Sequence, residues 1–181
     1  MSYITLIDNS MKTSYPFHFR VATVSAACAI MLAACGSNTA STSGTVVGSY
    51  FQNAKVCADL NNNGVCDAGE PMATTDNSGN FTVGAAGVPI VAEITPGAIR
   101  YEPSTGTSIP ITSKIVLRAP KDAPGIVSVQ STSVVSEMET NSLSFSDAKT
   151  KVATRLNVSA DNLLSDYNKL ASGNTYLPLM K

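Results

Sequence analysis

The sequence predicts a mainly β fold, a small antiparallel sandwich followed by short C-terminal α-helices, behind a disordered N-terminal signal and tether. Short runs rich in Val, Ile, Thr, Tyr and Phe recur between Thr45 and Leu117, separated by Gly, Pro and Ser turns, which is typical of an antiparallel sandwich. Beyond residue 120 apolar residues recur at helical spacing instead. The length of 181 residues suits one domain of ordinary size.

The predicted sandwich spans residues 45–120. Its first segment, Thr45 to Leu60, is rich in Val, Tyr and Phe and predicts two short strands or one bent strand, because Val56 and Ala58 alternate with polar neighbours. Three further strands are expected at Asn80–Val83, Pro89–Thr95 and Ile109–Leu117.

The predicted helical segment spans residues 121–181. A short helix is expected over 131–141, and a better one over 144–158, where Ser144 or Ser146 can cap the N-terminus. Apolar residues at helical spacing form one stripe in each of the last two helices, over 144–158 and 159–171: Ala148, Val152 and Leu156, then Leu163, Tyr167 and Leu170. We interpret these stripes as core or docking faces.

The N-terminus carries the features of an export signal. Lys12, His18 and Arg20 precede an apolar run over residues 21–34, which is shorter than the ~20 residues that span a bilayer. We therefore expect residues 1–34 to be a removable signal peptide. Asp8 is out of character for its first part, so Met11 is an alternative start.

The apolar run ends in Leu32-Ala33-Ala34-Cys35, which resembles the lipobox of bacterial lipoproteins. The resemblance implies cleavage before Cys35 and a diacylglycerol thioether on its sulfur, so that the membrane is a partner through acyl chains. An ordinary signal peptide cleaved nearby and an uncleaved anchor remain the alternatives. Gly36 follows the cysteine, and by analogy with lipoproteins this favours the outer membrane, with residues 35–44 as lipidated cysteine and flexible tether.

The segment Cys57–Glu70 reads CADLNNNGVCDAGE and has the spacing of a calcium loop of the EF-hand type. Gly64 supplies the sharp turn, alternate side chains offer oxygen atoms, one backbone carbonyl contributes and the last carboxylate can close the shell. The expected ligands are Asp59, Asn61, Asn63, Val65, Asp67 and Glu70. Hard oxygen donors favour calcium over zinc or copper.

The segments that flank this loop differ from those of an ordinary EF-hand. The incoming segment has strand character, and Pro71 is followed by a stretch too short and too β-branched for an exiting helix. We therefore expect the loop, residues 59–70, to be inserted between two strands. A metal-free turn, held by side-chain to backbone hydrogen bonds, is the alternative.

Of the four cysteines, Cys28 lies in the signal peptide and Cys35 in the lipobox, which leaves Cys57 and Cys66. A bridge between these two would join the entry of the loop to its far side, and an oxidising compartment permits it. Free thiols and a redox pair are the alternatives, although the spacing is not Cys-x-x-Cys.

The run from Thr45 to Val83 contains AKVC, DLNNNG, DAGEP and TDNSGNF, and it resembles the SdrD B-like and carboxypeptidase regulatory-like group of prealbumin-like β-sandwich modules from bacterial surface proteins. The resemblance implies a non-catalytic module that calcium stabilises, used in adhesion or as a spacer, with Asp76 as a further ligand. The later segments TSVVSEM, LNV and LLSDY resemble a group of long proteobacterial outer-membrane lipoproteins, whose chains continue further. This allows the present chain to be a fragment.

The composition argues against catalysis and nucleic-acid binding. The formal net charge is -1, which gives no electrostatic reason to expect a nucleic-acid partner. The only histidine, His18, lies in the signal, and motifs for nucleophilic catalysis or phosphate binding are missing. Four glutamates could meet as carboxylate pairs, though without a spacing signal: Glu93, Glu102, Glu137 and Glu139. We expect a structural, adhesive or assembly module, or alternatively a protein that binds a glycan or small ligand.

Overall fold

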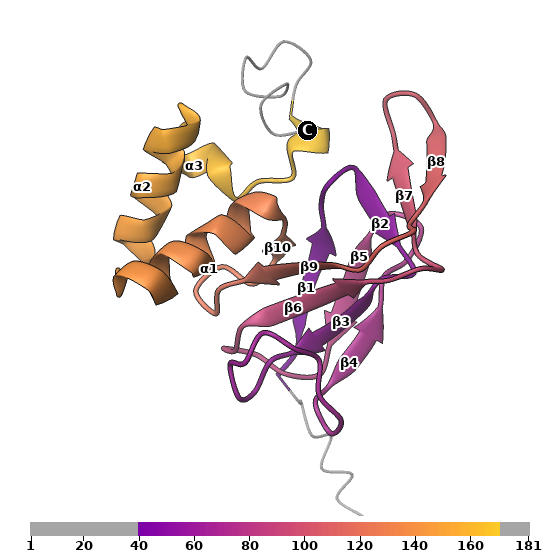
Figure 1. Ribbon diagram of the computed structural model, residues 1–181, viewed down its shortest axis with the longest axis horizontal. Helices are drawn as coiled ribbons and strands as arrows, with labels where there is room; N and C mark the ends of the chain where they lie inside the picture. Colours follow the sequence, from indigo (N-terminus) through magenta and orange to yellow (C-terminus); the bar gives the residue numbers. More distant parts are fainter. Residues whose placement is uncertain (1–39, 171–181) are drawn as a thin grey trace, which may run out of the picture. The chain divides into compact units, whose positions relative to one another are not determined.

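The structure is a computed structural model that describes residues 40–170. This part of the chain forms a β-sandwich followed by helices, as the sequence predicts (Figure 1). The strands are β1 (Thr42–Val46), β2 (Tyr50–Gln52), β3 (Lys55–Ala58), β4 (Met72–Thr74), β5 (Asn80–Val83), β6 (Ile90–Ile94), β7 (Ile99–Glu102), β8 (Thr107–Pro110), β9 (Ile115–Ala119) and β10 (Ile126–Val127). The helices are α1 (Val129–Asn141), α2 (Phe145–Leu156), α3 (Ala160–Leu163) and the 3-10 turn η1 (Tyr167–Lys169).

Several predicted features lie outside the described residues: the signal peptide over 1–34, the lipidated Cys35, the first part of the tether and the last residues of the helical segment, 171–181. Among residues 40–170, no helix combines the length and the apolar character that crossing a bilayer requires.

The strands form three sheets. The largest has the order β4-β3-β6-β9 and is antiparallel throughout. A second sheet has the order β10-β1-β5, in which β1 pairs with β5 antiparallel and with β10 parallel. The third, β2-β7-β8, contains the hairpin of β7 and β8 that projects beyond the sandwich (Figure 1).

The main core lies between the first two sheets. Because successive side chains of a strand point to opposite faces, every second residue of β3 and β6 enters it. From the large sheet come Val56, Ala58, Ile90, Ala92, Ile94, Leu117 and Ala119, and from the β10-β1-β5 sheet Val46, Phe81, Val83 and Val127. Apolar burial of this kind, at about 25 cal/mol per Å², is what stabilises a sandwich.

Strand β1 begins at Thr42, earlier than the predicted start at residue 45, so the end of the predicted tether belongs to the sandwich. Gly44 pairs with Phe81, and a Cβ on Gly44 would lie 2.4 Å from the carbonyl oxygen of Gly125. Gly44, which made the end of this segment look like a linker, is needed here because two backbones approach closely.

The prediction of one continuous strand over Ile109–Leu117 was wrong, because this segment contains parts of two strands. Strand β8 ends at Pro110 and β9 begins at Ile115, and the two belong to different sheets. Proline has no N–H group to donate and ends the ladder, which allows the chain to cross from the hairpin to the edge of the large sheet.

Helices α1 and α2 pack on each other around a second core, in which Val134, Ala148, Val152 and Leu163 are buried. Ser128 caps α1 with a reciprocal pair of bonds to Ser131, and Ser144 caps α2 by accepting from the N–H of Asp147. The apolar stripe predicted for the 144–158 helix is confirmed at Ala148 and Val152, which are both buried.

The predicted helix over 159–171 is interrupted. Helix α3 ends at Leu163, and the turn η1 begins after Asp166, whose carboxylate accepts from the N–H of Asn168. Burial of Tyr167 against Val47 of the sandwich explains the break, because the chain leaves the helical core to reach a different one. Tyr50 donates to Asp166 over 3.0 Å, and burial with this neighbour raises the pKa of Tyr50 to about 12.

Candidate metal centre

The 59–70 loop joins β3 to β4, two antiparallel neighbours, so its predicted insertion between strands is confirmed. It lies on the outer face of the large sheet. There Cys57 pairs with Val91 on β6, and Val91 pairs with Arg118 on β9, which makes one row across three strands. Cys66, from the loop, is buried against Cys57 and Val91.

Cys57 and Cys66 form a disulfide with a Cα–Cα distance of 5.5 Å. The predicted structural bridge is therefore confirmed. It fastens the middle of the loop to the strand from which the loop departs, and both cysteines are buried. A covalent link across a separation of nine residues restricts the loop before any ligand binds.

Asp59 is fully buried and organises the first turn of the loop. Its Oδ1 accepts from the N–H of Asn63 over 3.0 Å and its Oδ2 accepts from the N–H of Gly64 over 2.8 Å. Gly64 adopts φ +76, a backbone conformation that glycine reaches without strain. The carboxylate of Asp59 is thus held with the turn curled around it.

Asp67 lies opposite, at the far side of the loop. Its Oδ2 accepts from the side-chain amides of Asn61 over 2.9 Å and Asn63 over 2.7 Å. These two hydrogen bonds hold the pKa of Asp67 below its ordinary value, so this carboxylate is ionised at neutral pH. Four predicted ligand side chains, those of Asp59, Asn61, Asn63 and Asp67, therefore belong to one hydrogen-bonded curl.

Glu70 closes the two ends of the loop on each other. Its Oε1 accepts from the N–H of Leu60 over 2.8 Å, and its Oε2 accepts from the N–H of Asp67 over 3.0 Å. Val65, expected to offer its carbonyl, donates its N–H to Oδ1 of Asn63, and its side chain is 45% exposed. All six predicted residues thus lie in the curl or close it.

The donor set suits a hard cation, because carboxylate and amide oxygens are the ligands that calcium prefers. In the structure the amide nitrogens of Asn61 and Asn63 face Asp67, and they supply the positive partial charge that a cation would supply. Among residues 40–170, no three or more Asp, Glu, Cys or His side chains gather closely enough to hold a metal by themselves. Rotation of both amides by half a turn would present oxygens instead, at the loss of the hydrogen bonds that Oδ1 of Asn61 and Oδ1 of Asn63 accept from the N–H groups of Asn63 and Val65.

Asp76, which the family resemblance implied as a further ligand, has a local role. Its Oδ1 accepts from the N–H groups of Ser78 and Asn80, each over 2.8 Å, within the turn between β4 and β5. The hydrogen bond from Asn80 and those that accompany it lower the pKa of Asp76. The structure gives this carboxylate the role of a turn cap.

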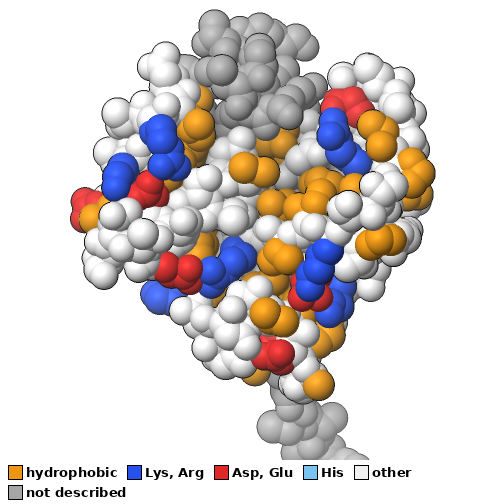
Figure 2. Space-filling model, in the orientation of Figure 1, with side chains coloured by type: hydrophobic (Ala, Val, Ile, Leu, Met, Phe, Trp, Pro, Cys, Tyr) orange, Lys and Arg blue, Asp and Glu red, His pale blue; other side chains and the backbone are white. Residues whose placement is uncertain are grey.

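The four glutamates considered as carboxylate pairs each have partners of their own. Glu93 lies between Lys55 and Lys114, Glu137 binds Lys151 and Arg155, and Glu139 binds Arg118. Glu102 accepts from the hydroxyls of Ser49 and Ser104. On the face shown in Figure 2, positive and negative side chains are interspersed, without a broad area of one charge.

Sequence reasoning missed Arg118. Its guanidinium lies over the loop, since a Cβ on Gly64 would be 3.2 Å from its Nε, and the same group binds Glu139 of α1. Its Nε is buried without a hydrogen-bond partner among the described residues. Residues 64, 118 and 139 are far apart in the chain, so no local pattern could have revealed this contact.

No protein-family model, curated protein or solved structure matches this chain. The chemistry of the loop and the motifs of the sequence are therefore the basis for a proposed role.

Proposed function

We propose that this chain is a lipid-anchored extracytoplasmic module with a structural, adhesive or assembly role, stabilised by calcium in the 59–70 loop. The observation that supports the calcium site is the convergence of Asp59, Asn61, Asn63 and Asp67 inside a loop closed by a disulfide. Calcium would be held by the oxygens of these side chains, by the carbonyl of Val65 and by Glu70. It would supply charge neutralisation and cross-linking of the loop.

The proposed location has two independent supports. The first is the lipobox-like Leu32-Ala33-Ala34-Cys35, which would place a lipid on Cys35 and hold the protein at the outer membrane. The second is the Cys57–Cys66 disulfide, because disulfides form and persist in oxidising compartments such as the bacterial periplasm and cell surface. Calcium is also available there, so location and loop chemistry agree.

A non-catalytic role is part of the proposal. The four glutamates considered as carboxylate pairs are engaged in ion pairs or in hydrogen bonds with hydroxyls. The resemblance to prealbumin-like modules of bacterial surface proteins also supports a non-catalytic role. In this role the sandwich and helices would present a rigid surface to a protein or glycan partner outside the cytoplasm.

The calcium proposal is tested by thermal unfolding in excess chelator and in increasing calcium. With an affinity of about 10⁻⁴–10⁻³ M, calcium at about 10 mM should raise the melting temperature by a few degrees. Magnesium at the same concentration should raise it less. Asp67→Asn keeps the shape of the side chain and should abolish most of the calcium effect, whereas Asp122→Asn, an exposed carboxylate outside the loop, should retain it.

An unchanged melting temperature on addition of calcium would contradict the site, as would an undiminished calcium effect in Asp67→Asn. The anchor is tested separately, by substitution Cys35→Ser and fractionation of cells. The proposal expects the variant to leave the membrane fraction, and a variant that stays there contradicts lipidation at Cys35.

A further inference from the structure

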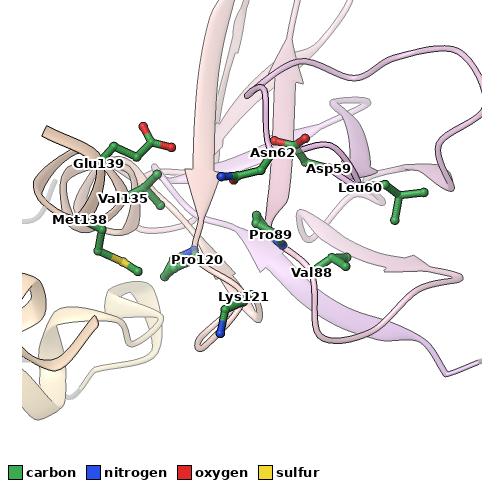
Figure 3. A pocket seen from close by; sticks show the side chains of 10 residues that line it. All are labelled: Asp59, Leu60, Asn62, Val88, Pro89, Pro120, Lys121, Val135, Met138 and Glu139. Atoms are coloured by element: carbon green, nitrogen blue, oxygen red, sulfur yellow. The ribbon is translucent and has the colours of Figure 1, made fainter. Parts of the chain in front are cut away.

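A groove of about 290 Å³ lies between the 59–70 loop and helix α1 (Figure 3). Loop residues form one wall and α1 forms the other, while the connections before β6 and after β9 form the base. The apolar side chains that line it are Leu60, Val88, Pro89, Pro120, Val135 and Met138. Leu60 is 57% exposed although it is a large apolar residue on a polar loop.

The wall that carries Leu60 is held in place. The N–H of Leu60 donates to Glu70, and the neighbouring Asp59 is fully buried with its carboxylate bound to the turn. The Cys57–Cys66 disulfide fastens the same loop to the sheet. The groove is therefore largely formed in advance, which reduces the free-energy cost of ordering a binding site.

The charged side chains around the groove differ in how strongly they are already bound to other groups of the protein. The carboxylate of Asp59 accepts two backbone N–H groups, and both oxygens of Glu139 accept from Arg118. Lys121 is different, because its side chain is 61% exposed and its partner is the adjacent, also exposed, Asp122 at 3.2 Å. Such surface pairs are weak, so the Lys121 ammonium can exchange Asp122 for a ligand anion.

We propose that this groove binds a small apolar anion, a hydrocarbon body with one carboxylate, whose charge pairs with Lys121. An apolar cavity of about 150 Å³ accommodates benzene, so the present groove suits a body of about two fused rings or a short acyl chain. A glycan was also an alternative ligand in the sequence analysis. A sugar would need several hydrogen-bonding groups, whereas the charged groups here are mostly engaged and the lining is mostly apolar.

The proposal is independent of the calcium proposal, since hydrogen bonds and the disulfide already hold Leu60. The test uses the purified full-length chain at one fixed calcium concentration. Two probes of the same shape are compared, naphthalene-2-carboxylate and the neutral naphthalene-2-carboxamide. Binding is followed by NMR titration of the backbone amides, which reports both the affinity and the place.

Both probes should bind with a Kd of about 1 mM or tighter, the range for ligands of this size, and shift amides of residues 59–62, 88–89, 120–121 and 135–139. The carboxylate should bind about three- to fivefold more tightly than the carboxamide. Lys121→Gln should remove this difference and leave the carboxamide affinity unchanged. The matched variant Lys149→Gln, a lysine of α2 outside the groove, should retain it.

Leu60→Ser should weaken both probes severalfold, whereas Val129→Ser, a more exposed apolar residue outside the groove, should not. The proposal is overturned if neither probe binds, if the shifts map to another surface, or if Leu60→Ser leaves both affinities unchanged. It is also overturned if the carboxylate has no advantage over the carboxamide in the unmodified chain.

Discussion

Arg118 of β9 and Glu139 of α1 form a two-point ion pair, with Nη1 to Oε2 at 2.8 Å and Nη2 to Oε1 at 2.7 Å. This geometry fixes both distance and orientation. Because the same guanidinium lies over Gly64, the pair connects the edge of the sandwich, the first helix and the 59–70 loop.

Glu139→Gln should therefore lower the free energy of unfolding by about 0.5–1 kcal/mol, the upper part of the range for pairs of this exposure. The side chain of Glu139 is 45% exposed, which limits the effect, while Arg118 is only 17% exposed and loses its main partner. Urea unfolding measures the loss. Asp122→Asn breaks the fully surface-lying pair with Lys121 and should cost less, so equal losses in the two variants would argue against a special role for Arg118.

Removal of the disulfide should lower the free energy of unfolding by about 2–3 kcal/mol, because the separation between Cys57 and Cys66 is nine residues. The double substitution Cys57→Ala and Cys66→Ala tests this without introducing buried hydroxyl groups. Urea unfolding with and without reductant provides the control, since reductant should destabilise the unmodified chain and leave the double variant unchanged. A double variant as stable as the unmodified chain would contradict the expectation.

Glu93 should make stability depend on pH. Burial opposes its ionised form, but hydrogen bonds and charge from Lys55 and Lys114 outweigh burial and lower its pKa. A carboxylate whose pKa is lower in the folded state contributes stability above its unfolded pKa, and the contribution disappears as pH falls through the folded pKa.

Glu93→Gln should therefore cost about 1–3 kcal/mol at pH 7 and progressively less below about pH 4. Chemical unfolding across this pH range, with the unmodified chain in parallel, measures the difference. A loss that is the same at both ends of the range would show that the side chain acts through shape and not through charge.

Gly44→Ala tests where the sandwich begins. Within a flexible tether the substitution would be neutral, but in β1 the new methyl group would lie 2.4 Å from the carbonyl oxygen of Gly125 and 2.8 Å from the ring of Phe81. We expect a loss of about 1–3 kcal/mol, measured by thermal or urea unfolding. Gly84→Ala is the matched control, because a Cβ there has open space, and equal behaviour of the two variants would place Gly44 outside the strand.

Local patterns in the sequence were sufficient for much of the fold. The alternation around Val56 and Ala58 identified a strand, and Asn80–Val83 was predicted with the bounds of β5. The spacing of Ala148 and Val152 identified α2, and of the two predicted caps, Ser144 and Ser146, the structure has Ser144. These features depend on the period of a single element and on its neighbouring residues, which are present in any short stretch of sequence.

The errors occurred where distant segments meet. Gly44 ends a segment whose composition is typical of a linker, and only its close approach to Gly125 shows that it belongs to a strand. Pro110 ends β8, and the chain then crosses to another sheet, whereas Tyr167 leaves its helix because it is buried in a cluster with Val47. Tertiary contacts outweighed local propensity at Gly44 and Tyr167. Pro110 is different, because its missing N–H group is a local signal that a strand ends.

The sequence by itself determined the class of the fold, the insertion of the loop between two strands and the residues that lie in it, because each follows from short-range spacing and side-chain chemistry. Only the tertiary structure decided that Cys57 and Cys66 are joined, that Arg118 spans the loop and α1, and that Leu60 faces an apolar groove. The physical reason is that these contacts depend on which faces of the sheet and of the helix are brought together. Packing across the whole chain sets that arrangement, not the pattern of any one segment.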